Sequence, residues 1–106
     1  MRTYTFELDN KTYTLRYGYN AICDLEDLSN KPIQNIFTEK AFGFSQARLL
    51  IYVGLKWKIQ GITRQQAGFI CEKLAEEDRF ETVITKAGEL LVASVSKGNE
   101  TNVAGE

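Results

Sequence analysis

The stretch QARLLIYVGLKWKIQ, residues 46–60, decides the fold. Its apolar side chains surround the axis of the predicted helix, which is typical of a central buried helix or of one that also offers surface to a partner. Ser45 is suited to cap the first turn, and Gly61 follows the last. Gly54 would cost about 1 kcal/mol relative to Ala in an exposed helix. We therefore expect another element to pack closely against Gly54.

The N-terminal segment, residues 3–17, alternates polar and apolar side chains. The apolar positions of its two halves are Tyr4, Phe6, Leu8, Tyr13, Leu15 and Tyr17. Such alternation in a segment rich in Thr, Tyr and Phe, interrupted at Asp9 and Asn10, predicts an antiparallel β-hairpin with one face in water. Because an isolated hairpin is only marginally stable, we expect its apolar face to pack on the helices.

Between the hairpin and the central helix the period of the sequence becomes helical. Apolar residues recur every three positions, at Tyr19, Ile22, Leu25 and Leu28. This spacing predicts a short amphipathic helix. Pro32 suits the first turn of a second short helix over residues 33–37. Residues 38–44 are predicted to form a loop.

Two amphipathic helices are predicted after the central helix. Thr63 and Gln66 fit a capping box at the start of the first. The apolar faces of the two helices comprise Ala67, Ile70, Cys71 and Leu74, and then Phe80, Val83, Ile84, Ala87, Leu90 and Leu91. Residues 96–106 are predicted to be a flexible polar tail. The sequence thus predicts an α+β fold, an N-terminal antiparallel β-hairpin packed on a mostly helical bundle of about four helices, in a single domain over residues 1–95.

Composition excludes most catalytic chemistry. The 106 residues include no histidine, which removes Ser-His-Asp and Cys-His arrangements and every zinc site that uses histidine. Cys23 and Cys71 stand far apart with no C-x-x-C motif, so we expect two reduced thiols, with a disulfide as the alternative. The acidic clusters at residues 24–27 and 72–78 are interpreted as solvated helix faces rather than acid–base or cation sites. We predict no enzymatic activity, no cofactor and no metal.

Charge and hydropathy also restrict the partners. With 13 Lys and Arg against 14 Asp and Glu, the net charge of −1 offers no global field for nucleic acid or an anionic membrane. The longest nearly apolar stretch, residues 49–55, is far shorter than the ~20 residues that span a bilayer. No charged-then-apolar leader opens the sequence, so a cytoplasmic location is expected.

One basic cluster contains an aromatic residue. Lys56, Trp57 and Lys58 are consecutive, and Arg48 and Arg64 lie nearby in the sequence. Base stacking on Trp57 between phosphate-binding lysines is one interpretation. The favoured one is a buried indole at the helix end, flanked by lysines whose stems cover it.

Large aromatic side chains are more numerous than one small core requires. Beside those of the hairpin, they are Phe37, Phe42, Phe44, Tyr52, Trp57 and Phe69. Filling of the core is the default role of each one. Taken together they indicate surface that is buried against another chain. We predict partner binding through Phe42, Phe44, Tyr52, Trp57 and Phe69.

The order of these segments resembles a known family. The features are FELDNKTYTLR at residues 6–16, AICDLEDL at 21–28, and LLIYVGL at 49–55 leading to GIT at 61–63. They are similar to those of the small tail assembly chaperones of tailed bacteriophages and prophages, including relatives encoded by gene transfer agents. The resemblance covers about residues 3–92, and its motifs are structural rather than catalytic.

The resemblance implies a non-enzymatic role in tail morphogenesis. Such chaperones coat the long helical tape measure protein before the tail tube polymerises around it, and they can recruit tail tube subunits. They act in the bacterial host cytoplasm and are absent from the mature virion; self-association and a longer frameshifted form are compatible with the role. The family provides no binding residues to transfer by position.

Two alternatives remain open at this point. The first is a structural tail or head–tail connector subunit of the virion. The second is a small nucleic-acid-binding regulator that uses Lys56, Trp57, Lys58 and Arg64.

Overall fold

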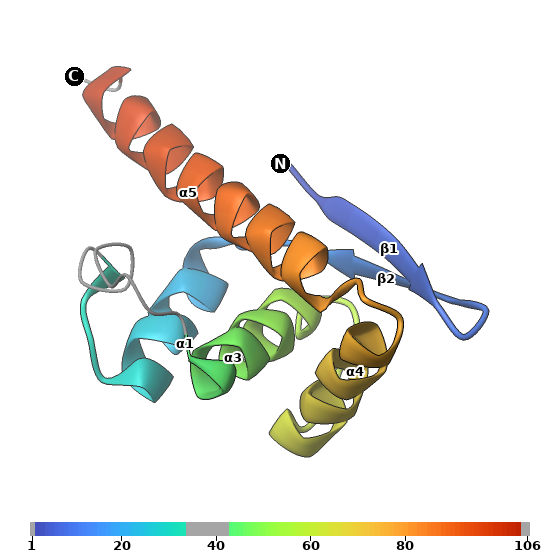
Figure 1. The fold of residues 1–106 in the computed structure, drawn as a ribbon. Helices are drawn as coiled ribbons and strands as arrows, with labels where there is room; N and C mark the ends of the chain where they lie inside the picture. Colours follow the sequence, from blue (N-terminus) through green and yellow to red (C-terminus); the bar gives the residue numbers. More distant parts are fainter. Residues whose placement is uncertain (1, 34–42, 105–106) are drawn as a thin grey trace.

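The hairpin and four helices account for the described part of the chain. The computed structural model describes residues 2–33 and 43–104, with side chains up to residue 95. The elements are β1 (Tyr4–Leu8), β2 (Lys11–Leu15), α1 (Tyr19–Ser29), α3 (Phe44–Leu55), α4 (Arg64–Glu76) and α5 (Phe80–Ala104). Figure 1 shows the hairpin and the helices arranged around α3, with α5 projecting beyond them. The predicted α+β fold, with its N-terminal hairpin, is confirmed.

The hairpin has the predicted turn and the predicted faces. Tyr4 pairs with Leu15 and Leu8 with Lys11 in an antiparallel ladder. Asp9 and Asn10 between the strands both have positive φ, 51° and 65°, which suits the twist of a two-residue hairpin turn. The buried face consists of Phe6, Leu8 and Leu15, with Tyr4 and Tyr13 partly buried beside them.

The central helix α3 is buried nearly all round. Its buried residues are Ala47, Leu49, Leu50, Ile51, Val53, Gly54 and Leu55. It contacts α1, α4, α5 and β2, so every other layer of the molecule packs on it. The sequence prediction of a central helix is confirmed.

Gly54 is where the hairpin enters the core. The Arg16 backbone N–H donates to the Gly54 carbonyl at 3.0 Å. A Cβ at Gly54 would lie 2.8 Å from the Tyr17 Oη and 2.9 Å from the Leu15 Cδ2, closer than such atoms can approach. The Tyr17 hydroxyl donates to the Leu50 carbonyl at 2.7 Å. The close packing expected at Gly54 is therefore real, and we call this contact the Tyr17–Gly54 junction.

The ends of α3 differ from the prediction. Gly43, not Ser45, is the N-cap, and the Gly43 N–H donates to the Gln46 side chain at 3.0 Å. The helix ends at Leu55 rather than at residue 60, and a turn follows in which the Lys58 and Ile59 N–H groups both donate to the Leu55 carbonyl. This turn places the Trp57 indole against β2, where it donates to the Thr14 carbonyl at 3.0 Å.

The C-terminal helices follow their predicted faces, but α5 is longer than expected. The capping box is formed, with Gln66 N–H donating to Thr63 Oγ1 at 3.1 Å and Thr63 N–H to Gln66 Oε1 at 2.9 Å. The backbone of α5 continues to Ala104, through much of the segment predicted as a polar tail. The predicted helix over 33–37 and loop over 38–44 lie mostly outside the described residues, and Phe44 already belongs to α3.

Across the parts of the chain that the structure describes, no helix combines the length and the apolar character needed to cross a bilayer.

Candidate functional site

The predicted partner-binding residues do not form one patch. Phe44 is 86% exposed, Phe69 58% and Trp57 41%, while Tyr52 is half-buried. Phe42 lies outside the described residues. Phe44 and Phe69 line two different hollows, and Trp57 rests on the hairpin. Each location is therefore considered separately.

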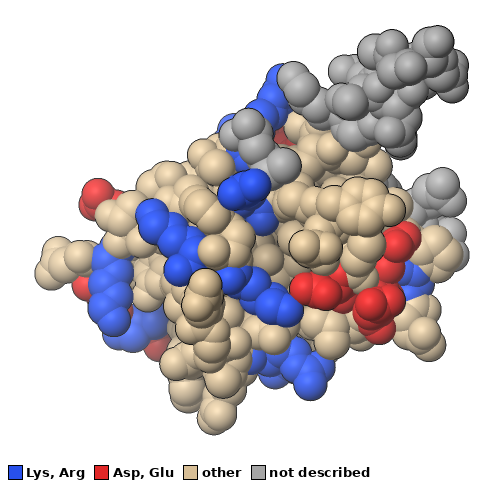
Figure 2. All heavy atoms as spheres, turned by 180° about the vertical axis from the view of Figure 1, so that it is seen from behind, with Lys and Arg blue, Asp and Glu red and all other residues tan. Residues whose placement is uncertain are grey.

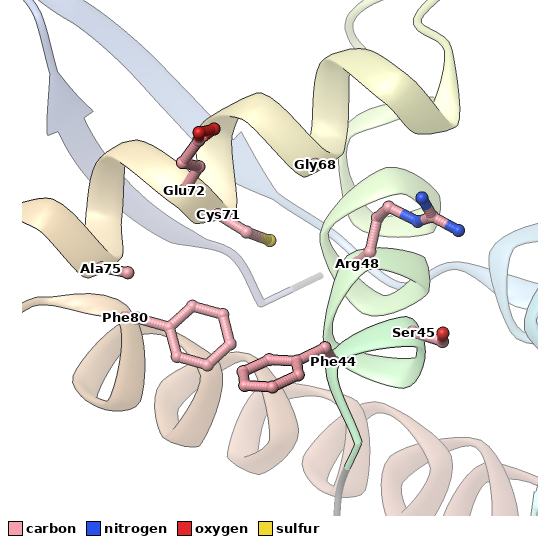
Figure 3. Close-up of a pocket in the computed structure, with 8 residues that line it drawn as sticks. All are labelled: Phe44, Ser45, Arg48, Gly68, Cys71, Glu72, Ala75 and Phe80. Carbon is pink, nitrogen blue, oxygen red and sulfur yellow. The ribbon is translucent and has the colours of Figure 1, made fainter.

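The first hollow lies between α4 and the starts of α3 and α5, and we call it the Phe44 groove. Its volume is about 330 Å³, and its lining is Phe44, Ser45, Arg48, Gly68, Cys71, Glu72, Ala75 and Phe80. Figure 3 shows the Phe44 and Phe80 rings side by side along one wall, opposite the helix that carries Cys71 and Ala75. The two ring centroids are 6.2 Å apart. Phe80 thus supports a Phe44 ring that is otherwise open to solvent.

The opposite wall of the Phe44 groove is made of small side chains on α4. Gly68, Cys71 and Ala75 succeed one another along this helix (Figure 3). At Gly68 a Cβ would lie 3.3 Å from the Arg48 Cδ, so the absence of a side chain lets the stem of Arg48 lie against α4. Farther along, the small side chains of Cys71 and Ala75 leave room for an incoming chain to approach α4 closely.

The Cys71 thiol is part of this wall. Burial raises its pKa from 9.0 to about 11, and the positive charge of Arg48 opposes this only in part. The thiol is therefore protonated near neutral pH, whereas the reactive form of cysteine is the thiolate. Cys23 and Cys71 are both free, so the predicted reduced thiols are found rather than a disulfide.

The second hollow, about 600 Å³, lies between the hairpin and α4, and we call it the hairpin groove. Its lining is Leu8, Asp9, Lys11, Thr12, Tyr13, Ile59, Ile62, Gln66, Phe69, Ile70 and Lys73. Lys73 and Asp9 form an ion pair at 3.0 Å that joins α4 to the hairpin turn. Phe69 therefore stands beside a hollow with a more polar lining, which an ion pair already spans.

The surroundings of Trp57 differ from the prediction, because the indole that was expected to be buried is 41% exposed and Arg16 joins Lys58 beside it. The Arg16 guanidinium lies 5.1 Å and the Lys58 ammonium 5.9 Å from the centre of the Trp57 ring. Lys56 lies 5.4 Å from the Tyr52 ring and forms an ion pair with Asp24 at 2.9 Å. That hydrogen bond with Asp24 raises the pKa of Lys56.

The surroundings of the basic cluster weaken the nucleic-acid interpretation. On the face of the molecule that Figure 2 shows, Lys and Arg side chains lie close to a group of Asp and Glu side chains, so this face is not uniformly positive. The indole N–H of Trp57 is already bonded to β2, and Lys56 is paired. Arg48, which the sequence suggested as a neighbour, lines the Phe44 groove instead.

Sequence reasoning found Phe44 but not the groove around it. Phe80 and Cys71 were assigned only to the apolar faces of their own helices, and Ala75 was not singled out, because their meeting with Phe44 depends on how three helices pack. The combination of an aromatic residue at each of two helix starts, Phe44 and Phe80, is the signal that could have indicated it.

Within the described residues, no three His, Cys, Asp or Glu side chains gather in a way that could hold a metal ion. No model of a known protein family, no curated protein and no solved structure matches the chain.

Proposed function

We propose that this protein is a non-enzymatic assembly chaperone that binds the tape measure protein of a phage or prophage tail. The main observation in support is Phe44, an aromatic side chain that is 86% exposed at the rim of a largely apolar groove. Apolar surface that the fold leaves open is typical of protein–protein binding sites. The resemblance of the sequence to tail assembly chaperones supplies the class of partner.

The physical requirements of such a chaperone agree with a shallow groove. A long amphipathic helix that waits for its tube exposes an apolar stripe and aggregates unless it is covered. Helix-in-groove packing covers such a stripe. Many weakly bound copies along one target give avidity while each copy remains displaceable. Recruitment of tail tube subunits is an additional step of the same proposal, in the cytoplasm of the bacterial host.

Co-expression with the tape measure protein tests the proposal. We expect the tape measure protein to become soluble with this chain and the complex to survive gel filtration. Phe44→Ser should reduce the soluble complex by about tenfold, the loss expected for one exposed aromatic anchor. Tyr19→Ser is the matched control, since Tyr19 is 83% exposed and lines neither groove. Equal solubility of the tape measure protein with and without the chain would contradict the proposal.

Two other functions have specific tests. A structural tail or connector subunit would be found by mass spectrometry in purified virions, where a chaperone is absent. A nucleic-acid-binding regulator is favoured by the contact of Trp57 with Arg16 and Lys58. It would give a mobility shift that weakens steeply with salt and is lost in a Lys58→Glu variant.

A further inference from the structure

The charged residues of α4 are arranged opposite to the order that its helix dipole favours. Arg64 opens the helix and its first turn has no acidic residue, whereas Glu72 and Glu76 lie toward its C-terminal end, followed by Glu77 and Asp78. Helices are stabilised by the opposite arrangement, with acidic residues at the N-terminus. The one basic residue of the last turn, Lys73, is paired with Asp9. The order of charges therefore does not serve the stability of α4.

The Phe44 groove runs along this polar helix and shares its polarity. Arg48 lies against Gly68 in the N-terminal half of α4, and Glu72 lines the groove farther along, toward Ala75 (Figure 3). Neither Arg48 nor Glu72 takes part in an ion pair within the described residues. Arg48 therefore offers a positive charge beside Gly68, and Glu72 offers a negative charge about one helical turn farther along α4. The Glu72 carboxylate points away from the Phe44 and Phe80 rings, and Ala75 and Phe80 continue the groove beyond it (Figure 3).

We propose that the Phe44 groove docks an amphipathic helix antiparallel to α4, with basic residues in its N-terminal half and acidic residues in its C-terminal half. In this direction the positive end of the helix dipole meets the acidic end of α4. The negative end meets Arg48. The apolar ridge of the helix lies between the Phe44 and Phe80 rings and the small side chains of α4, which permit close approach. The inference rests on the proposed function in one respect only, namely that the docked helix belongs to the tape measure protein.

The hairpin groove is a poorer site for the same helix. The ion pair between Lys73 and Asp9 crosses from α4 to the hairpin, and a helix would have to break it to enter. Its lining also includes Lys11, Thr12 and Gln66, whose polar groups would lose water against an apolar ridge. Phe69 is therefore the matched control for Phe44.

Two designed peptides of identical composition test the direction of docking. Both carry a leucine ridge; one has lysines in its N-terminal half and glutamates in its C-terminal half, and the other has these charges exchanged. By fluorescence anisotropy with the full chain at low salt, we expect the first peptide to bind about fivefold more tightly, the effect of roughly 1 kcal/mol of charge and dipole interaction. High salt should reduce this preference. Equal affinities, or no binding of either peptide, would overturn the proposal.

Variants of the protein locate the site. Phe44→Ser should weaken both peptides about tenfold, whereas Phe69→Ser should change neither dissociation constant more than about twofold. The double variant Arg48→Glu with Glu72→Lys should invert the preference between the two peptides. Equal losses in the Phe44 and Phe69 variants would overturn the assignment, as would a dimer of the free chain that dissociates in the Phe44 variant, because the groove would then hold a second copy. Since the peptides do not come from a tape measure protein, their binding can succeed where co-expression fails.

Discussion

The Tyr17–Gly54 junction and the Phe44 groove are both places where α3 meets another element through apolar groups, but only one is filled. At the junction a single added Cβ would collide with Tyr17 and Leu15. At the groove a hollow of about 330 Å³ remains beside an aromatic ring that is 86% exposed. Packing of the junction explains how the hairpin is held on the helices. Cys71 and Phe80 are part of the core or pack against it, whereas the exposed Phe44 ring contributes little to that packing and needs another explanation.

The largest difference in the free energy of unfolding should be found between two variants that each add one methyl group at a helical glycine. Gly54→Ala should lower the free energy of unfolding by about 2 kcal/mol, because overpacking outweighs the better helix propensity of Ala. Gly88→Ala in α5 should raise it by about 0.5–1 kcal/mol, since nothing lies within 4 Å of the added Cβ. Urea denaturation of both variants measures this difference. A Gly54 variant as stable as the wild type would show that the junction is loosely packed.

Removing the hydroxyl of Tyr17 should have the next largest effect. Tyr17→Phe deletes the hydrogen bond to the Leu50 carbonyl while keeping the ring in the core. We expect a loss of about 1–1.5 kcal/mol, the value typical of a buried hydrogen bond. Tyr19→Phe is the control, because Tyr19 is 83% exposed, and it should leave the denaturation midpoint unchanged.

Alkaline pH should lower the free energy of unfolding through Cys71 in the wall of the Phe44 groove. The pKa of Cys71 is about 11 in the folded chain and 9.0 without burial, so the folded state favours the protonated thiol. Below pH 9 the protonated thiol contributes its full amount to the free energy of unfolding. As the pH rises toward 11 this contribution is lost, and the free energy of unfolding falls by about 1 kcal/mol, a value reduced to allow for partial exposure to solvent. Denaturation at pH 8 and pH 11 measures the loss, and Cys71→Ala should show a smaller one. An identical pH dependence in the variant would contradict this assignment.

The contact of Trp57 with β2 should contribute less. Trp57→Phe removes the N–H that donates to the Thr14 carbonyl, at a site that is 41% exposed. A loss of about 0.5–1 kcal/mol is expected, since water can replace the donor. Thermal unfolding measures it, with Lys58→Ala as a neighbour that keeps the hydrogen bond.

The smallest effect on stability belongs to Phe44. Phe44→Ser should change the free energy of unfolding by no more than about 0.5 kcal/mol, as is usual for exposed positions. Its effect on peptide and partner binding should be much larger. A loss of several kcal/mol in this variant would mean that Phe44 holds the fold together, and the contrast between junction and groove would disappear.

Local patterns in the sequence predicted much of this fold. The alternation around Asp9 and Asn10 predicted the hairpin, the apolar run over residues 46–60 predicted the central helix, and Thr63 with Gln66 predicted a helix start. Each of these signals lies within a few consecutive residues. Even the close approach at Gly54 could be expected, because a glycine in a buried helix needs a reason.

Features that depend on tertiary contacts were not predictable in the same way. The early end of α3 at Leu55 accompanies the bond between Trp57 and Thr14, residues more than forty positions apart. The Phe44 groove combines residues of three helices whose packing angles no local pattern specifies. The grouping of these aromatics by residue type therefore selected the exposed Phe44, Trp57 and Phe69 together with the half-buried Tyr52, without showing that they lie at separate places.

The Trp57 indole also limits how the sheet can grow. Its bond to the Thr14 carbonyl occupies one backbone group on the outer edge of β2, and just beyond the strand the Arg16 N–H donates to the Gly54 carbonyl. An unprotected strand edge can recruit strands from other molecules and lead to fibrous aggregates. With these groups engaged by its own chain, the C-terminal end of β2 is less open to pairing with a strand of another molecule.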